Sequence, residues 1–259
     1  MPKPKIVAIT NQKGGVGKTT TAVNLAACLA EAGHDVLLVD LDPQGNASTG
    51  IGISDEARAK STYDLLTEDA TLSEVIQPTD FDNFRIIPAT SDLASAEMQL
   101  SDQRNRLSIL RNALQAEAQA DYILIDCPPA LGLLTLNALV AADSVMIPLQ
   151  TEFFALEGLS QLLLTIREVR QSANPNLRIE GVVLTMSDIR NNLSQQVEAD
   201  ARATLGDVVY QTVIPRNVRL SESPSFARPI IHYDRQSKGA TAYSELTAEF
   251  LNKQKKGRG

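Results

Sequence analysis

Residues 11–21 read NQKGGVGKTTT and follow the apolar run from Lys5 to Thr10. Glycines in such a stretch let the backbone curl, so that successive N–H groups point at one anion. The residues that follow carry apolar side chains at helical spacing, and Gly33 stands where a left-handed cap would end a helix. A helix that begins at the glycine turn adds its dipole to the anion site. The stretch therefore predicts a strand, a phosphate-binding loop and a helix in direct succession.

Further short apolar runs recur along the chain with helical patterns between them. Most are nearly continuous, as strands buried on both faces require. Their alternation with helices predicts an α/β fold, a doubly wound and mostly parallel sheet with helices on both faces. Two more helices are predicted at about Leu93–Ala118 and Leu156–Ser172, and mobile connections at 42–62 and 186–193. The predicted strands are 5–10, 35–40, 84–88, 122–126, 144–149, 179–185 and 208–214.

Length and composition favour one domain over residues 1–259. The chain has 259 residues, of which 43% are hydrophobic and 21% charged, close to globular averages. Cys28 and Cys127 are too few for a disulfide framework and lack metal-binding spacing. His34 and His232 lack it too, and we expect them to be structural or surface residues. No signal peptide and no membrane-spanning run is evident. We therefore expect a cytoplasmic protein.

The charge is unevenly distributed. The net charge is −7, yet residues 182–259 contain eleven Lys and Arg against eight Asp and Glu. A basic tail is predicted at about 252–259, where Lys253, Lys255, Lys256 and Arg258 cluster. Basic tails are often merely solvated, so this bias alone does not indicate a nucleic-acid partner.

The glycine loop meets the phosphate-loop pattern G-x-x-x-x-G-K-[ST] except at Gln12, where the pattern has glycine. In that pattern Lys18 would neutralise β and γ phosphates, and the Thr19 hydroxyl would ligate Mg²⁺. Asp126 ends an apolar strand, as do Asp40 and Asp42. Carboxylates at the carboxyl ends of parallel strands face the ligand crevice of such folds. These residues together predict a nucleotide site at one edge of the sheet.

Four separate segments resemble the ParA/MinD family of ATPases. KGGVGKTTT is similar to its deviant Walker A signature, and the preceding NQ resembles the ParA (Soj) branch. The resemblance continues through VDLDPQGNAST at 39–49, ILIDCPPALG at 123–132 and VIPRNVRLSESPSFARPI at 213–230. It spans nearly the whole chain, in the family's order. It implies a P-loop NTPase fold of the deviant Walker A type.

The resemblance also implies site roles. Lys13 would reach across an ATP-dependent sandwich dimer to the partner's ATP, much as an arginine finger acts in trans. Asp126 would hold Mg²⁺ through water, and Asp42 would position the attacking water at the metal site, with Asp40 in a supporting role. Pro215 and Asn217 would flank the adenine. The implied cofactor-binding residues are Lys13, Gly14, Gly15, Val16, Gly17, Lys18, Thr19, Thr20, Pro215 and Asn217; catalysis would rest on Lys13, Lys18, Asp42 and Asp126, and Mg²⁺ on Thr19, Asp42 and Asp126.

The implied activity is slow ATP hydrolysis, stimulated by DNA and a partner. Arg190 and Arg219 match positions of a nonspecific DNA-binding surface, to which Lys253, Lys255 and Lys256 would add. With no base-reading module in the sequence, contacts should be to phosphate. A ParB-type centromere-binding protein would be the stimulating partner. The expectation is a nucleoid-associated ATPase for chromosome or plasmid segregation.

Four other functions are alternatives. A MinD-like membrane switch needs an amphipathic terminal helix, and after Leu251 no large apolar residue follows, so membrane binding is disfavoured. A related ATPase could instead position a protein cargo. A small-molecule ATP-dependent enzyme on the same fold would need a second substrate pocket, and a scaffold that binds ATP without hydrolysis would release no phosphate.

Overall fold

The computed structural model describes residues 3–101, 103–117, 119–152 and 155–256. Its centre is one sheet with the strand order β3-β4-β2-β5-β1-β6-β7. Neighbouring strands are parallel except β3, which pairs antiparallel with β4. The strands are β1 (Lys5–Ile9), β2 (Val36–Asp40), β3 (Gln77–Pro78), β4 (Phe84–Ile87), β5 (Tyr122–Asp126), β6 (Ser144–Gln150) and β7 (Arg178–Thr185).

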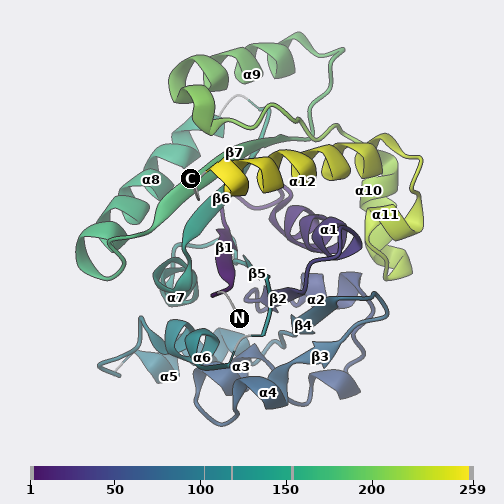
Figure 1. The fold of residues 1–259 in the computed structure, drawn as a ribbon. Coiled ribbons are helices and arrows are strands. Elements are labelled where there is room, and N and C mark those ends of the chain that lie inside the picture. Colours follow the sequence, from purple (N-terminus) through teal and green to yellow (C-terminus); the bar gives the residue numbers. More distant parts are fainter. Residues whose placement is uncertain (1–2, 102, 118, 153–154, 257–259) are drawn as a thin grey trace.

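Helices cover both faces of this sheet (Figure 1). They are α1 (Lys18–Glu31), α2 (Asn46–Gly50), α3 (Thr62–Leu66), α4 (Leu72–Val75), α5 (Leu93–Leu100), α6 (Ile109–Glu117), α7 (Leu133–Ala141), α8 (Ala155–Ser172), α9 (Asn192–Leu205), α10 (Val218–Glu222), α11 (Ile230–Tyr233) and α12 (Lys238–Lys256). Short 3-10 helices span Glu56–Arg58, Gly206–Val208 and Ser223–Phe226. The predicted doubly wound, mostly parallel α/β fold is confirmed.

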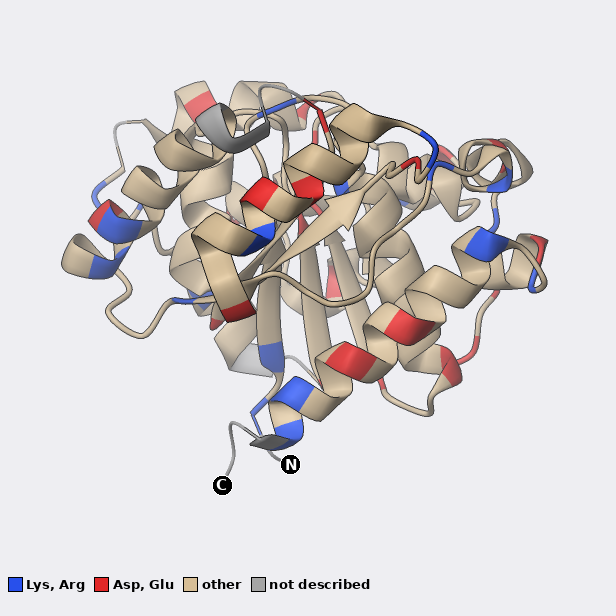
Figure 2. Cartoon of the chain, turned by 90° about the horizontal axis from the view of Figure 1, so that it is seen from above, with Lys and Arg blue, Asp and Glu red and all other residues tan. Residues whose placement is uncertain are grey.

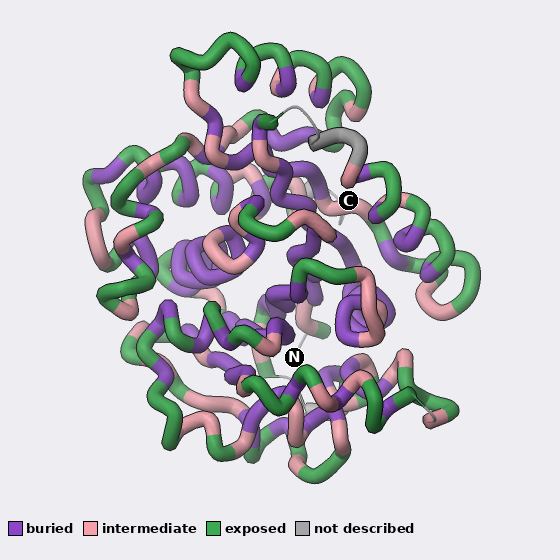
Figure 3. The backbone as a smooth tube through the Cα atoms, turned by 180° about the vertical axis from the view of Figure 1, so that it is seen from behind, coloured by how far each residue is buried: buried purple, intermediate pink, exposed green. Residues whose placement is uncertain are grey.

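Alternation along the strands produces two hydrophobic layers. Ile6 and Ala8 of β1 face the layer that includes α5 to α8, while Val7 and Ile9 face the layer of α1, α11 and α12. Each fully buried aliphatic side chain contributes about 1.5–3 kcal/mol relative to an exposed one. Figure 3 shows the buried residues concentrated in the middle of the molecule. Both layers hold the strands in place, so the carboxyl edge of the sheet is a rigid platform.

The predicted strand at 208–214 is wrong. The segment makes one isolated bridge to β7, between Val209 and Val182, and just beyond it Pro215 bridges to Ser187. Between these points the N–H groups of Gln211 and Thr212 donate to the carboxylate of Glu249 in α12, each at 2.9 Å. Because these donors are satisfied by a side chain, the segment forms no continuous ladder with β7.

The predicted helix 93–118 is two helices. α5 ends at Leu100 and α6 begins at Ile109. Between them, the backbone carbonyl of Arg106 accepts a 2.7 Å hydrogen bond from the side-chain amide of Asn137 in α7. The Arg106 carbonyl, which would accept a bond from within a continuous helix, is thus satisfied by a side chain of α7 instead. The segment 42–62, predicted to be a connection, likewise contains α2 and a 3-10 turn.

The predicted basic tail is helical over most of its length, because α12 continues to Lys256. Lys253 lies over the ring of Tyr210, with its ammonium 3.7 Å from the ring centroid. Arg258 and the side chain of Lys256 lie outside the described residues. Among the helices of the described residues, none is both long and apolar enough to cross a bilayer.

Candidate nucleotide-binding site

The glycine loop lies between β1 and α1, at the carboxyl edge of the sheet. Gly15 and Gly17 adopt φ angles of 73° and 87°, which side chains other than glycine rarely tolerate. Gly17 is the N-cap of α1 and offers no capping side chain, so the first N–H groups of α1 remain available to a ligand. Thr185 of β7 anchors the loop by donating a 2.8 Å hydrogen bond to the Val16 carbonyl. The loop is therefore shaped and oriented to bind an anion.

The two lysines of the loop differ in environment. Lys18 is buried, and its ammonium donates a 3.0 Å hydrogen bond to the carbonyl of Lys13. Burial lowers the pKa of Lys18, while the nearby Asp126 carboxylate opposes that shift. The Lys13 side chain is 40% exposed and pairs with Glu152, 3.0 Å away, in the chain after β6. One lysine thus lies inside the loop, and the other lies on its outer surface.

Asn11 and Gln12 fasten the first half of the loop to neighbouring elements. The Asn11 amide donates to the Pro148 carbonyl of β6 at 2.8 Å, and its oxygen accepts from the Lys13 N–H at 3.1 Å. The Gln12 amide donates to the Gly158 carbonyl of α8 at 2.9 Å. Gln12 is the position at which the sequence departs from the phosphate-loop pattern, and here it links the loop to α8.

Asp40 and Asp126 face each other in register at the ends of β2 and β5. Both are fully buried. Neither carboxylate oxygen of Asp126 has a hydrogen-bond partner among the described residues. Burial raises the pKa of Asp126 well above its ordinary value, and the Asp40 charge adds to this, although the Thr19 hydroxyl and Lys18 partly offset it. Orphaned buried carboxylate oxygens are costly unless a cation or donor satisfies them, so Asp126 fits a metal ligand.

Asp40, by contrast, has partners. Its carboxylate accepts hydrogen bonds from the Ser48 hydroxyl at 2.6 Å and the Ser48 N–H at 2.9 Å. The Ser48 hydroxyl in turn accepts from the Ala89 N–H at 3.1 Å. Burial raises the pKa of Asp40 to about 6, against the lowering effect of these bonds. Asp40 therefore ties α2 to the ends of β2 and β4.

The remaining carboxylate, Asp42, starts the segment between β2 and α2. It is 7% exposed, and its side chain accepts a 3.0 Å hydrogen bond from the Gln44 N–H. No group of three or more His, Cys, Asp and Glu side chains within the described residues is arranged to hold a metal. Magnesium commonly binds through one or two carboxylates plus water and substrate phosphate, so this set suits it only together with a nucleotide.

A cavity of about 280 Å³ adjoins the glycine loop, next to Gly17 and Thr20. Pro215, Arg216 and Asn217 form part of its wall. Asn217 also caps α10, because its side chain accepts a 3.2 Å hydrogen bond from the Leu220 N–H. The cavity is mostly apolar with a few polar groups, as expected for a site that holds a flat base.

The predicted basic residues lie at two places. Arg190 lies in a loop and Arg219 at the start of α10, and the segments that lead to them are joined through the bridge between Ser187 and Pro215 at the carboxyl edge of the sheet. The end of α12 lies instead at the amino edge, where Gln254 donates to Glu180, near the start of β7. Figure 2 shows basic positions at the end of α12 near the start of β1, whose Lys5 also pairs with Glu180. Lys253 and exposed Lys255 are therefore not brought beside Arg190 and Arg219.

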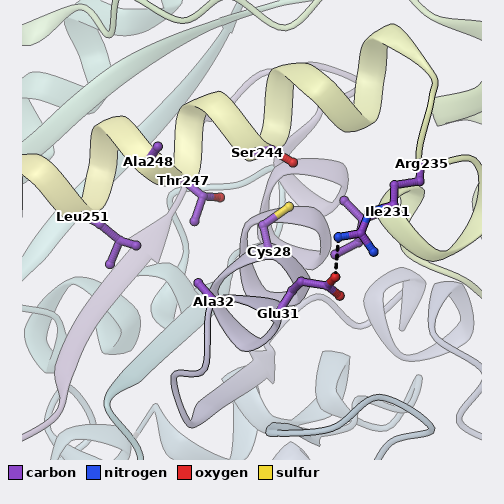
Figure 4. A pocket seen from close by; sticks show the side chains of 9 residues that line it. All are labelled: Cys28, Glu31, Ala32, Ile231, Arg235, Ser244, Thr247, Ala248 and Leu251. Atoms are coloured by element: carbon purple, nitrogen blue, oxygen red, sulfur yellow. Dashed lines mark ion pairs between the residues drawn. The ribbon is translucent and has the colours of Figure 1, made fainter.

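A second cavity, of about 260 Å³, lies at the far end of α1 (Figure 4). Cys28, Ile231 and Leu251 contribute to its lining, and Arg235 pairs with Glu31 at 2.6 Å. Burial raises the pKa of Cys28 to about 11, so this thiol is a poor nucleophile. Since the arginine is already paired, the cavity is less suited to phosphate than the glycine loop.

Sequence reasoning missed Glu152, Ser48 and Arg216. Glu152 lies in a segment of no recognised pattern, and Ser48 lies within VDLDPQGNAST, where only the aspartates were singled out. Only the fold places them beside Lys13 and Asp40. Arg216 stands between Pro215 and Asn217, which were predicted to flank the adenine. Its position in the segment IPRN, between two predicted site residues, is the signal by which Arg216 could have been found.

Comparison with known proteins agrees with this geometry. The family described as "AAA domain" matches residues 4–179. The chain is 56% identical to the sporulation initiation inhibitor protein Soj of Bacillus subtilis (strain 168), covering 95% of this chain and 97% of that protein. It is 53% identical to the chromosome partitioning protein ParA of Myxococcus xanthus (strain DK1622), covering 96% and 88%.

Among solved structures, the chain resembles cobyrinic acid a,c-diamide synthase from Mycobacterium smegmatis with bound ADP and magnesium. The TM-score is 0.86 at 38% identity, over 98% of this chain and 96% of that one.

A parallel sheet, a glycine loop with two lysines and an orphaned strand-end carboxylate define a P-loop ATPase of the deviant Walker A type. The chain belongs to the ParA/Soj family of chromosome-partitioning ATPases.

Proposed function

We propose that this ATPase acts as an ATP-driven switch, in which ATP and Mg²⁺ join two copies of the chain into a sandwich dimer. The observation that carries this proposal is the contrast between the two lysines. Lys18 is buried in its own loop, whereas Lys13 is 40% exposed and makes one exposed ion pair. An exposed cation at the mouth of a phosphate site is free to reach a second molecule's phosphates.

Each residue of the site has a distinct task in this proposal. The loop N–H groups and Lys18 bind the phosphates, and Pro215 and Asn217 bound the cavity for the adenine. Thr19 and Asp126 hold Mg²⁺, with Asp42 beside them. The metal neutralises charge on the phosphates when bound. Asp42 orients the water that attacks the γ-phosphate. Because positioning does most of the work, turnover is slow until DNA and a partner complete the site.

The dimer binds double-stranded DNA without sequence preference. Arg190 lies in a loop that is joined to the segment before α10, and Arg219 lies in α10. Both are exposed, so they can contact backbone phosphates. Linking two weak patches in a dimer raises avidity by about 10²–10⁴-fold when both engage. A ParB-type centromere-binding protein then stimulates hydrolysis and release. The protein is accordingly cytoplasmic and nucleoid-associated, and moves a chromosome or plasmid.

The test is DNA co-sedimentation of the Asp42→Ala variant with ATP, with ADP and without nucleotide, over a salt series. Loss of Asp42 should stall hydrolysis and hold the ATP state. Salt-sensitive retention on DNA of arbitrary sequence with ATP alone supports the switch. Equal retention on DNA with ATP, with ADP and without nucleotide would mean that basic residues bind DNA independently of the switch. The double variant with Arg219→Glu should lose DNA retention but still bind ATP.

A small-molecule ATP-dependent enzyme is the second candidate, and one observation favours it. A cavity of about 310 Å³ adjoins Thr19 and Thr20, with the polar residues Asn24, Asn46 and Arg228 in its wall. It could accept a second substrate, and the solved relative described above bears the name of a metabolic synthase. ATP consumption that depends on a carboxylate substrate, with a phosphorylated or amidated product, would favour this function over the switch.

A further inference from the structure

The loop 186–191 and the segment 214–219, whose last two residues begin α10, form one unit at the carboxyl edge of the sheet. The Ser187 N–H donates to the Ile214 carbonyl at 3.1 Å, and the Arg216 N–H donates to the Ser187 carbonyl at 2.9 Å. These reciprocal bonds hold the two loops side by side. Arg190 therefore has a fixed neighbour in Arg216, which is exposed and was not among the residues predicted to bind DNA.

The arginines of this unit differ in how their charge is compensated. Arg190 makes two hydrogen bonds to the Asp188 carboxylate, at 3.0 and 2.9 Å. Arg219 pairs with Glu222 at 3.0 Å and with Asp234 at 3.4 Å.

In the part of the chain that the structure describes, the Arg216 guanidinium makes neither an ion pair nor a hydrogen bond. Arg216 is the member of this group whose charge is uncompensated by direct contact.

Arg216 also lies between two sites. It is one of the residues that line the cavity adjoining Gly17, together with Pro215 and Asn217. On the other side it is close enough to Asp188 that its charge helps Arg190 to lower the pKa of that carboxylate to about 2. A base bound in the cavity would hold the segment 214–219, and with it Arg216, in one position. Less conformational entropy would then be lost when Arg216 contacts a phosphate.

We propose that Arg216 is a phosphate-binding residue of the DNA surface. Unlike Arg190 and Arg219, it does not have to break an ion pair with a carboxylate before it binds a phosphate. This inference rests on the proposed DNA-binding function. A paired arginine must exchange a carboxylate for a DNA phosphate, so its net contribution is reduced, whereas an unpaired exposed arginine only loses water and releases counterions. The ligand is the backbone of double-stranded DNA, and the contact carries no sequence information.

The experiment compares DNA binding by the wild type, Arg216→Ala and Arg216→Lys, with a non-hydrolysable ATP analogue and a linear duplex of arbitrary sequence over a salt series. Arg216→Ala should weaken binding about tenfold or more and reduce the log–log salt slope by about 2 per dimer, near 0.9 for each phosphate contact. Arg216→Lys should restore most of the affinity, because lysine also binds phosphate as a point charge.

Two controls separate this role from others. Arg170 is an exposed arginine in the last turn of α8, and Arg170→Ala should bind DNA as the wild type does. Because Arg216 also lines the cavity beside the glycine loop, DNA binding by both Arg216 variants is measured at analogue concentrations shown to saturate each of them. Wild-type DNA affinity and salt slope in Arg216→Ala at saturating analogue would overturn the assignment. If the wild type itself does not bind DNA with the analogue, the proposed DNA-binding function fails, and this contact with it.

Discussion

The ammonium of Lys13 lies 3.0 Å from the carboxylate of Glu152, a residue 139 positions further along the chain. The pair links the phosphate loop to the segment after β6 within one molecule. If Lys13 acts on a partner's ATP, it has to leave Glu152 first. The pair therefore opposes dimerisation by the free energy needed to separate it, which for an exposed ion pair is about 0.2–1 kcal/mol.

Replacing Glu152 by Gln should strengthen the ATP-dependent dimer by up to about fivefold, since Lys13 would no longer be held by a charge. Sedimentation equilibrium with a non-hydrolysable ATP analogue measures the dimer dissociation constant. Glu168→Gln, which alters an exposed carboxylate of α8, is the matched control and should change nothing. A weaker dimer in Glu152→Gln would mean that Glu152 supports the dimer rather than opposing it.

Asp126→Asn should stabilise the free protein while it removes magnesium-dependent nucleotide binding. The folded-state pKa of Asp126 is raised, so above its ordinary pKa the unfolded chain gives up this proton more readily than the folded one. The free energy of unfolding therefore falls as pH rises through that window, and Asn abolishes this loss.

Removing such an unpaired buried charge is worth about 1–3 kcal/mol, or several degrees in Tm. Thermal unfolding in EDTA at pH 5 and pH 8 tests this, and the gain should be larger at pH 8. Asp92→Asn changes an exposed carboxylate and serves as control. Equal Tm values for the wild type and Asp126→Asn at pH 8 would contradict the prediction.

Ser48→Ala should destabilise the protein by about 1–3 kcal/mol, because it leaves the Ala89 N–H without its acceptor and removes one donor from Asp40. The chain from Asp42 to α2 should then be held less firmly, so hydrolysis should slow while nucleotide affinity changes little. Chemical denaturation and phosphate-release kinetics measure the two effects. Ser54→Ala, at an exposed position before the 3-10 turn, provides a comparison. A loss of nucleotide affinity as large as the loss of rate would argue against a positioning role.

Asp188→Asn should raise DNA affinity in every nucleotide state, by about two- to fivefold, because Arg190 would be released and a negative charge removed from the surface. Fluorescence anisotropy with a labelled duplex measures the change. Glu68→Gln removes an exposed charge beyond α3 and should have no effect. If Asp188→Asn binds DNA no better than the wild type, the carboxylate does not limit the Arg190 contact.

Much of the fold could be predicted from the sequence because its signals are local. The apolar runs that became β1, β2 and β5 are buried on both faces, and the structure confirms them to within a residue. The α1 helix was predicted equally well, since Gly33 has the positive φ of 87° that a left-handed cap needs. The strand predicted at 208–214 was wrong because the N–H groups of Gln211 and Thr212 donate to the carboxylate of Glu249, a contact that no local pattern reveals.

The sequence by itself determined the phosphate loop, the residue types of the candidate site and the family. Glycines that accept positive φ, a lysine and a threonine at fixed spacing are properties of one short stretch. Only the tertiary structure decided which distant groups meet them. In the tertiary structure Asp126 lies opposite Asp40, and the Asp126 carboxylate oxygens have no hydrogen-bond partner among the described residues. Glu152 forms an ion pair with Lys13, and Lys253 and Lys255 of α12 lie at the opposite edge of the sheet from Arg190. Those relations depend on strand register and helix packing, which arise from the burial of the whole chain rather than from any one segment.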